Sequence, residues 1–167
     1  MARLLREVPD SWVSISATTR SPREGEQDGV QYFFKSDEEF DTLIEEDGLL
    51  EWATYADHRY GTPKSAVVGH IAQGKQVVLE IDVQGAFQVK AKLPEAHLVF
   101  IEPPSIEVLE ARLRGRGTET DEVIASRMEA AQVELSRKME YDIRIVNDDL
   151  ETATRQLVDY VNEKAEE

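Results

Sequence analysis

The alternation of apolar and polar residues predicts strands at several places along the chain. Residues 12–16 alternate, with two serines facing away from Val13 and Ile15, which is the period of a half-buried strand. Three short apolar runs have the length and composition of buried strands: residues 77–81, 98–101 and 143–146.

Helical patterns separate and follow these strands. Apolar residues recur at helical spacing over 84–92, 106–114 and about 121–140, and again behind Asp149. Thr120 has the position and side chain of an N-cap for the third of these segments. Because strands and helices of this length alternate, we predict an α/β fold with a parallel sheet covered by helices.

Residues 17–75 show a different pattern, with short predicted strands mixed with helices. Short strands are predicted at 32–34 and 49–53, and Ser36 begins a capping box before a helix. The pair at 62–63, Thr-Pro, is expected to cap and open a further helix. This part of the chain therefore reads as a small mixed insert between two strands of the main sheet.

Composition narrows the classes of function. The chain of 167 residues carries a formal net charge of −15, which opposes binding to nucleic acid because its phosphates would be repelled. No apolar stretch approaches the ~20 residues that cross a bilayer, and there is no cysteine. We expect a cytoplasmic protein that binds no membrane. Its histidines, His58, His70 and His97, lack the spacing of metal ligands.

Two arginines three residues apart form the first candidate site. Arg20 and Arg23 flank Pro22, whose ring restricts its own backbone and that of Ser21. Their guanidinium groups could therefore converge on one phosphate. A charged surface loop is the other interpretation of this pair.

Two carboxylates and two tyrosines are further candidates. Glu51 lies in an otherwise apolar strand, where it either points to solvent or needs a polar partner. Asp82 follows a buried strand and could bind a ligand at that edge, cap the next helix, or both. Tyr32 and Tyr60 could offer hydroxyl groups to a phosphate or could only pack.

Seven short segments stand in order along nearly the whole chain: SATTRSPR at 16–23, GVQYFF at 29–34, LEWA at 50–53, YGT at 60–62, EIDVQG at 80–85, RLRGRGT at 112–118 and IVNDD at 145–149. Together, at these compatible spacings, they resemble guanylate kinase. The resemblance implies a P-loop-kinase-like three-layer fold. Its core would comprise residues 1–16 and 76–167, with a GMP-binding subdomain over 17–75 and a helical lid over about 113–132.

The resemblance also implies roles for individual residues. The guanine would be addressed by Ser16, Glu51, Thr62 and Asp82, and the GMP phosphate by Arg20, Arg23, Tyr32 and Tyr60. The chemistry agrees, because a carboxylate matches the two adjacent N–H donors of a guanine edge. The catalytic arginines would be Arg20, Arg112, Arg116 and Arg127. Asn147 and Asp148 would lie beside the adenine of ATP, and Glu80 near the magnesium.

The implied reaction is the ATP-dependent phosphorylation of GMP to GDP, with Mg²⁺, in purine nucleotide metabolism. Arginines suit it, because phosphoryl transfer asks a protein mainly for positioning and charge neutralisation. The stretch 115–117, Gly-Arg-Gly, could be the hinge of the lid or a plain glycine C-cap. One departure concerns 57–60, Asp-His-Arg-Tyr, where the family usually has a glycine and a second tyrosine before Tyr60.

A second departure concerns the phosphate loop. Family members carry a strand, a loop of the form G-x-x-x-x-G-K-[ST] and a helix before the Ser-Ala-Thr-Thr-Arg stretch, and the 167 residues contain no such loop. Residues 1–9 resemble the second half of that helix. Three interpretations are open: an N-terminally shortened guanylate kinase, a non-catalytic guanylate kinase-like module that binds GMP or a phosphopeptide, or a paralogue that binds GMP without transfer and could self-associate.

Overall fold

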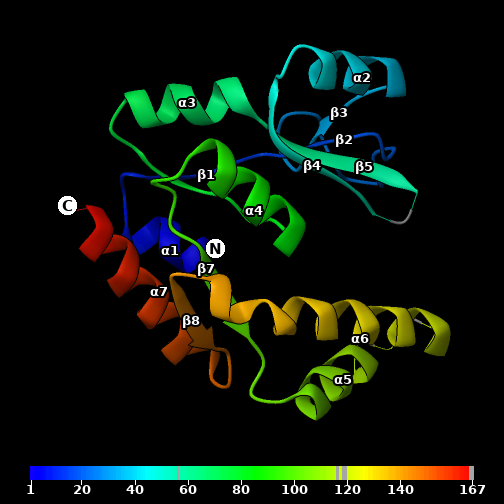
Figure 1. Ribbon diagram of the computed structural model, residues 1–167, viewed down its shortest axis with the longest axis vertical. Helices are drawn as coiled ribbons and strands as arrows, with labels where there is room; N and C mark the ends of the chain where they lie inside the picture. Colours follow the sequence, from blue (N-terminus) through cyan, green and yellow to red (C-terminus); the bar gives the residue numbers. More distant parts are fainter. Residues whose placement is uncertain (56, 116, 118–119, 166–167) are drawn as a thin grey trace. The chain divides into compact units, whose positions relative to one another are not determined.

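The computed structural model describes residues 1–55, 57–115, 117 and 120–165. The chain divides into two compact units, Met1–Ala96 and His97–Glu167, whose elements are labelled in Figure 1. Each unit is described by itself below.

The first unit contains a short parallel strand pair with helices. Strand β1 (Ser11–Val13) runs parallel to β6 (Gln76–Val78), with Trp12 opposite Val77. The helices are α1 (Ala2–Glu7), α3 (Lys64–Ala72) and α4 (Val83–Lys92). This pair confirms two of the predicted strands and their parallel pairing.

A second, four-stranded sheet belongs to the same unit. Its order is β3-β2-β5-β4, with β2 parallel to β3 and the other pairs antiparallel. The elements are β2 (Ala17–Thr18), β3 (Phe33–Phe34), α2 (Asp37–Glu45), β4 (Leu49–Tyr55) and β5 (His58–Pro63). The sequence pattern does not predict strand β5, because Arg59, Gly61 and Pro63 carry no alternating apolar signal.

Strand β4 joins two apolar clusters of this unit. Leu49 packs with Phe40 of α2, whereas Leu50 packs with Val67 of α3 and Val89 of α4. Because successive residues of a strand point to opposite faces, one strand serves both clusters. The strand therefore sets the position of α2 on one side and of α3 and α4 on the other.

The second unit is also built on a parallel strand pair. Strands β7 (Val99–Glu102) and β8 (Ile143–Val146) pair in parallel register. They are accompanied by α5 (Ile106–Gly115), α6 (Asp121–Ser136), the 3-10 helix η1 (Lys138–Glu140) and α7 (Leu150–Ala165). The helix predicted over 121–140 thus ends at Ser136, and its last turn is replaced by η1.

Capping follows the sequence in two helices and differs in a third. Ser36 and Glu39 form the predicted capping box, and Thr120 accepts from the amide of Val123. The expectation that Thr62 caps α3 is wrong. Pro63 is the N-cap residue, no side chain caps that helix, and the hydroxyl of Thr62 has a different partner.

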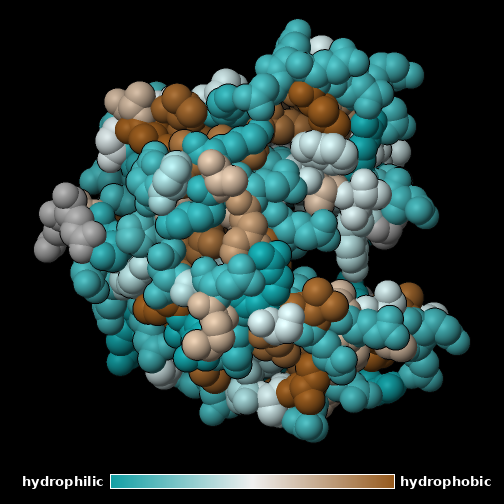
Figure 2. Space-filling model, viewed as in Figure 1, coloured by the Kyte–Doolittle hydropathy of each residue, from teal (hydrophilic) through white to brown (hydrophobic). Residues whose placement is uncertain are grey.

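The surface is predominantly polar. Most of the face in Figure 2 is hydrophilic, with apolar side chains in small groups, in keeping with a charged fraction of 32%. Among the described residues, no helix combines the length and apolar character required to cross a bilayer.

Candidate functional site

A bulge in β4 determines where Glu51 lies. Leu49 pairs with Pro63 and Glu51 with Thr62, so Leu50 is an additional residue on the β4 side of the ladder. A regular strand would send Leu50 and Glu51 to opposite faces. Here Leu50 packs among residues of α3 and α4 while the Glu51 carboxylate lies against Gly85 of α4. The bulge therefore directs a carboxylate toward the start of α4.

The Glu51 side chain is buried and hydrogen-bonded. Its residue is 5% exposed, and its Oε1 accepts from the hydroxyl of Thr62 at 2.6 Å. Burial raises the pKa of Glu51, the hydrogen bond from Thr62 opposes that rise, and the negative charge of Asp82 adds to it. The structure thus rejects the solvent-facing interpretation of Glu51.

Asp82 and Gly85 complete this polar cluster. Asp82 is the N-cap of α4, and its Oδ1 accepts from the Gly85 amide at 2.8 Å. A Cβ on Gly85 would lie 2.6 Å from Oε2 of Glu51, closer than van der Waals contact allows. The glycine therefore leaves room for the carboxylate. We call Glu51, Thr62, Asp82 and Gly85 the carboxylate pocket.

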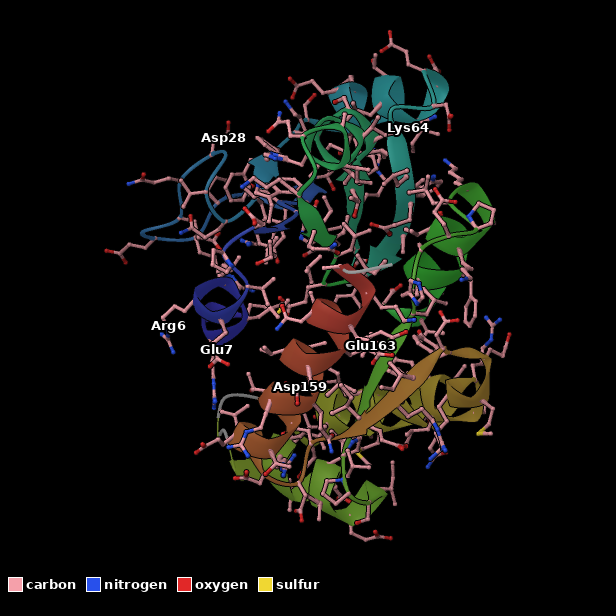
Figure 3. The ribbon with its side chains drawn as sticks, turned by 90° about the vertical axis from the view of Figure 1, so that its left-hand side faces the viewer. Arg6, Glu7, Asp28, Lys64, Asp159 and Glu163 are labelled. Carbon is pink, nitrogen blue, oxygen red and sulfur yellow. The ribbon has the colours of Figure 1, made fainter. Side chains whose placement is uncertain are left out.

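Two further contacts hold β4 and α4 together. The Gln88 side chain accepts from the Trp52 amide at 3.1 Å and donates to its carbonyl at 2.9 Å, so it pairs with the strand as another strand would. Asp47 accepts from Lys64 and Lys92, at 2.6 and 2.9 Å, and joins the turn after α2 to the start of α3 and the end of α4. Lys64 is labelled at the start of α3 in Figure 3.

A group of cationic and aromatic side chains lies in the same unit. The Arg20 guanidinium lies over the ring of Tyr32, 5.3 Å from its centroid, and 5.8 Å from that of Phe34. The rings of Tyr32 and Tyr60 are 6.0 Å apart in an edge-on arrangement. Glu26 raises the pKa of Arg20, and the Tyr60 phenol adds to that rise. Three of the predicted phosphate-binding residues are thus brought together.

The loop after β2 holds the remaining residues of this group. Glu26 accepts from the Arg20 guanidinium at 2.9 Å and from the Arg23 amide at 2.7 Å. Further along, Oδ1 of Asp28, labelled in Figure 3, accepts from the Phe34 amide at 2.8 Å. The exposed Arg23 side chain lies next to this network. We call Arg20, Arg23 and Glu26 of this loop the arginine loop.

Ser16 lies just before the strand that leads into the arginine loop. It precedes β2 directly, and its carbonyl accepts from the Phe33 amide at 2.9 Å. The next residues of β2, Ala17 and Thr18, are fully buried, and Thr18 Oγ1 accepts from the Arg20 amide at 3.1 Å. The strand thus fixes the start of the arginine loop.

The unusual residues before Tyr60 have a structural explanation. Asp57 adopts a left-handed backbone, with φ of 64°, a conformation that glycine takes without strain and aspartate tolerates. Arg59 stands where the family usually has a tyrosine. Its guanidinium binds Asp37 and Asp41 of α2 and lies 4.9 Å from the centroid of Phe40. An ionic and stacking contact therefore joins β5 to α2.

Several of the predicted residues belong to the second unit. Arg112 donates to the carbonyls of Asn147 and Asp148, at 2.8 and 3.3 Å, so α5 is joined to the loop after β8. Arg127 is partly buried on α6, and Arg116 lies outside the described residues. Gly117 has a φ of 65°, as a turn after a helix requires, and the lid over 113–132 stays a prediction.

Two features bear on metal and phosphate binding. Glu80, predicted near the magnesium, is exposed, and the described part of the chain holds no group of three or more potential metal ligands. Mg²⁺ in nucleotide sites is held by one or two carboxylates with substrate phosphates, so a single Glu80 fits that chemistry. The run at 69–75, GHIAQGK, has the glycine and lysine spacing of a phosphate loop, but Gln76 follows it in place of Ser or Thr. It spans the end of α3 and the turn after that helix, where carbonyls rather than amides are available for a ligand.

Sequence reasoning missed several residues of the site. No motif predicts the partners of Glu26 and Gln88. Glu26 binds the Arg20 side chain and the Arg23 amide, and Gln88 binds the backbone of Trp52, 36 residues away. Gly61 could have been suspected as part of the YGT segment. A Cβ at Gly61 would lie 2.8 Å from the Glu51 carbonyl, so the close approach of β5 to β4 requires a glycine.

Comparison with known proteins gives a uniform result. The family model described as Guanylate kinase matches residues 1–164. A "Guanylate kinase" of Synechococcus sp. (strain CC9311) is 52% identical over 162 residues, which cover 97% of this chain and 85% of that protein. A "Guanylate kinase" of Synechocystis sp. is 53% identical over 161 residues, covering 96% and 84%.

A solved structure agrees with these relatives. The crystal structure of guanylate kinase from Anaplasma phagocytophilum matches with a TM-score of 0.80 and 29% identity, over 97% of this chain and 80% of that one. The predicted α/β fold class is thereby confirmed. On the family model and the relatives together, this chain belongs to the guanylate kinase family.

Proposed function

We propose that the first unit binds GMP, with the guanine at the carboxylate pocket and the phosphate at the arginine loop. The observation that carries this proposal is the buried Glu51, which is 5% exposed and whose hydrogen bonds, among the described contacts, come from the hydroxyl and backbone of Thr62. A buried carboxylate needs partners. The two N–H donors of a guanine edge would supply them.

The roles of the other residues follow from their chemistry. Thr62 holds Oε1 of Glu51 and so orients the carboxylate, and Asp82 adds a second acceptor at the start of α4. Arg20, Tyr32 and Tyr60 supply a cation and two hydroxyls to a phosphate. Together these groups would hold the acceptor nucleotide in one orientation, which is the main requirement of phosphoryl transfer.

The reaction that we propose is transfer of a phosphoryl group from ATP to GMP. Arg112, Arg116 and Arg127 are proposed to neutralise charge on the transferring group, Asn147 and Asp148 to lie beside the adenine, and Ser16 and Arg23 to complete the GMP site. Mg²⁺ bound with ATP would neutralise charge on the phosphates, and Glu80 is the carboxylate proposed to lie near the ion. A place in purine nucleotide metabolism is part of the same proposal.

We further propose that the 167-residue polypeptide binds GMP more readily than it turns it over. Its sequence contains no run of the form G-x-x-x-x-G-K-[ST], whose amides, lysine and hydroxyl serve ATP and Mg²⁺. Formation of GDP at an ordinary kinase rate by this purified polypeptide, with ATP and Mg²⁺, would contradict this part of the proposal.

Calorimetric titration tests the binding proposal. The same sample is titrated with GMP, with AMP and with a phosphoserine peptide. We expect binding of GMP that is at least tenfold tighter than that of AMP, because each well-placed hydrogen bond to a charged group contributes about 1.5–3 kcal/mol. Binding of the peptide without binding of GMP would favour a non-catalytic phosphopeptide module instead.

A further inference from the structure

Within the arginine loop, Glu26 contacts both Arg20 and Arg23. Its carboxylate accepts from the guanidinium of Arg20 at 2.9 Å through one oxygen and from the amide of Arg23 at 2.7 Å through the other. The side chains of Glu26 and Arg20 are only 17% and 12% exposed. One carboxylate thus contacts both of the arginines that are assigned to the phosphate.

The backbone of Glu26 is part of the same arrangement. Its amide donates to the Arg23 carbonyl at 3.0 Å, while its carboxylate accepts from the Arg23 amide. The two residues therefore bind each other reciprocally, as the partners of a capping box do. Gly25, with φ of 85°, makes the turn between them.

Arg20 is held in one orientation by these contacts. Its guanidinium donates to the Ser21 carbonyl at 2.8 Å and to Glu26, and it lies over the ring of Tyr32. A guanidinium carries five N–H donors in a planar fork, so these contacts leave further donors for a phosphate. A fork fixed before the ligand arrives loses less conformational entropy on binding.

We propose that Glu26 is a positioning residue for the GMP phosphate, which fixes the Arg20 fork and the Arg23 backbone before the nucleotide binds. The inference rests on the proposed function and deepens it. Glu26 does not touch the nucleotide in this account; it acts through the two arginines. The opposite account would treat the carboxylate as a stand-in for the phosphate that GMP must displace, and the two accounts predict changes in affinity of opposite sign.

The test compares two ligands and two variants of the full chain. Glu26→Gln keeps the size of the side chain but removes the charge that holds Arg20. Glu24→Gln removes one charge from an exposed residue of the same loop and is the matched control. Each protein is titrated with GMP and with guanosine, which lacks the phosphate.

We expect Glu26→Gln to weaken GMP binding about tenfold, as loss of a charge-assisted hydrogen bond implies, and to leave guanosine binding unchanged. Glu24→Gln should bind both ligands as the unmodified chain does. Unchanged or tighter GMP binding by Glu26→Gln would overturn the inference, and so would an equal loss of guanosine binding, which would make Glu26 a residue of the fold alone. Failure of the unmodified chain to bind GMP would refute the proposed function itself.

Discussion

The two halves of the proposed GMP site are built on different principles. In the carboxylate pocket Glu51, Thr62 and Gly85 are buried and Asp82 is exposed at the edge. The pocket carries negative groups and is shaped by backbone: a bulge at Leu50 and a glycine at 85. The arginine loop is partly exposed and is shaped by ion pairing between Arg20 and Glu26. Burial makes an unmatched polar group costly and therefore selects one base. Charge near the surface attracts any phosphate and contributes affinity rather than choice.

The largest effect is expected from Glu51→Gln. This change replaces one acceptor oxygen by an amide donor that would face the guanine donors. We expect GMP and guanosine binding to weaken alike, by about 3 kcal/mol or roughly a hundredfold, measured by calorimetry. Loss of GMP binding with guanosine binding intact would show that Glu51 does not face the base.

Arg20→Ala should weaken the binding of GMP but not that of guanosine. Removal of the guanidinium takes away a charge-assisted contact to the phosphate, so GMP binding should weaken by about 2 kcal/mol, roughly thirtyfold. Guanosine binding should change little. If both ligands lost affinity equally, the arginine loop would support the fold rather than the phosphate, and the comparison would fail.

Gly85→Ala should show that the pocket is shaped by space. The added methyl would meet the Glu51 carboxylate, so we expect a loss of about 1–3 kcal/mol in the free energy of unfolding with weaker GMP binding. Gly69→Ala is the control, because nothing lies within 4 Å of that position in α3 and alanine favours a helix by about 0.5–1 kcal/mol. Thermal unfolding of both variants measures the difference. Equal stabilities would mean that the carboxylate moves aside freely.

The smallest effect is a pH dependence of opposite sign in the two halves. Burial raises the pKa of Glu51 above 4.5, so the folded chain binds the proton of Glu51 more tightly than the unfolded chain does. Protonation of Glu51 therefore favours the folded state at low pH, and this contribution is lost as pH rises through the folded pKa. Arg20 and the Arg23 amide lower the pKa of Glu26, so its contribution is present above 4.5 and is lost as pH falls.

Denaturant unfolding between pH 3 and about 7 tests this sign. The stability of the unmodified chain relative to Glu51→Gln should fall as pH rises, and its stability relative to Glu26→Gln should increase. The second trend should be weak, because a partly exposed pair is screened by solvent. Trends of the same sign would contradict the assignment of one buried and one paired carboxylate.

The sequence predicted those parts of the fold that rest on local patterns. The apolar runs at 98–101 and 143–146 gave strands that pair in parallel, as the predicted sheet requires, although Ile101 and Val146 are exposed rather than buried. Ser36 gave its capping box. Hydrophobic periodicity and capping are encoded within a few residues. Strand β5 was missed, since its register comes from contacts with β4 across a turn rather than from its own residues.

For the candidate site, residue types were easier to predict than their partners. Glu51 and Arg20 could be singled out from charge in an unusual setting. Whether Glu51 was buried depended on the bulge at Leu50, which no sequence pattern marked. Likewise, Thr62 was expected to cap a helix but donates to Glu51. Such contacts join residues distant in sequence, and periodicity carries no information on them.

The most direct test of the two-part site is amide hydrogen exchange with and without saturating GMP. The account predicts slower exchange in the presence of GMP over residues 16–34, 49–62 and 80–85, the segments that carry the arginine loop and the carboxylate pocket. The result that would contradict the account is GMP binding with unchanged exchange in these three segments.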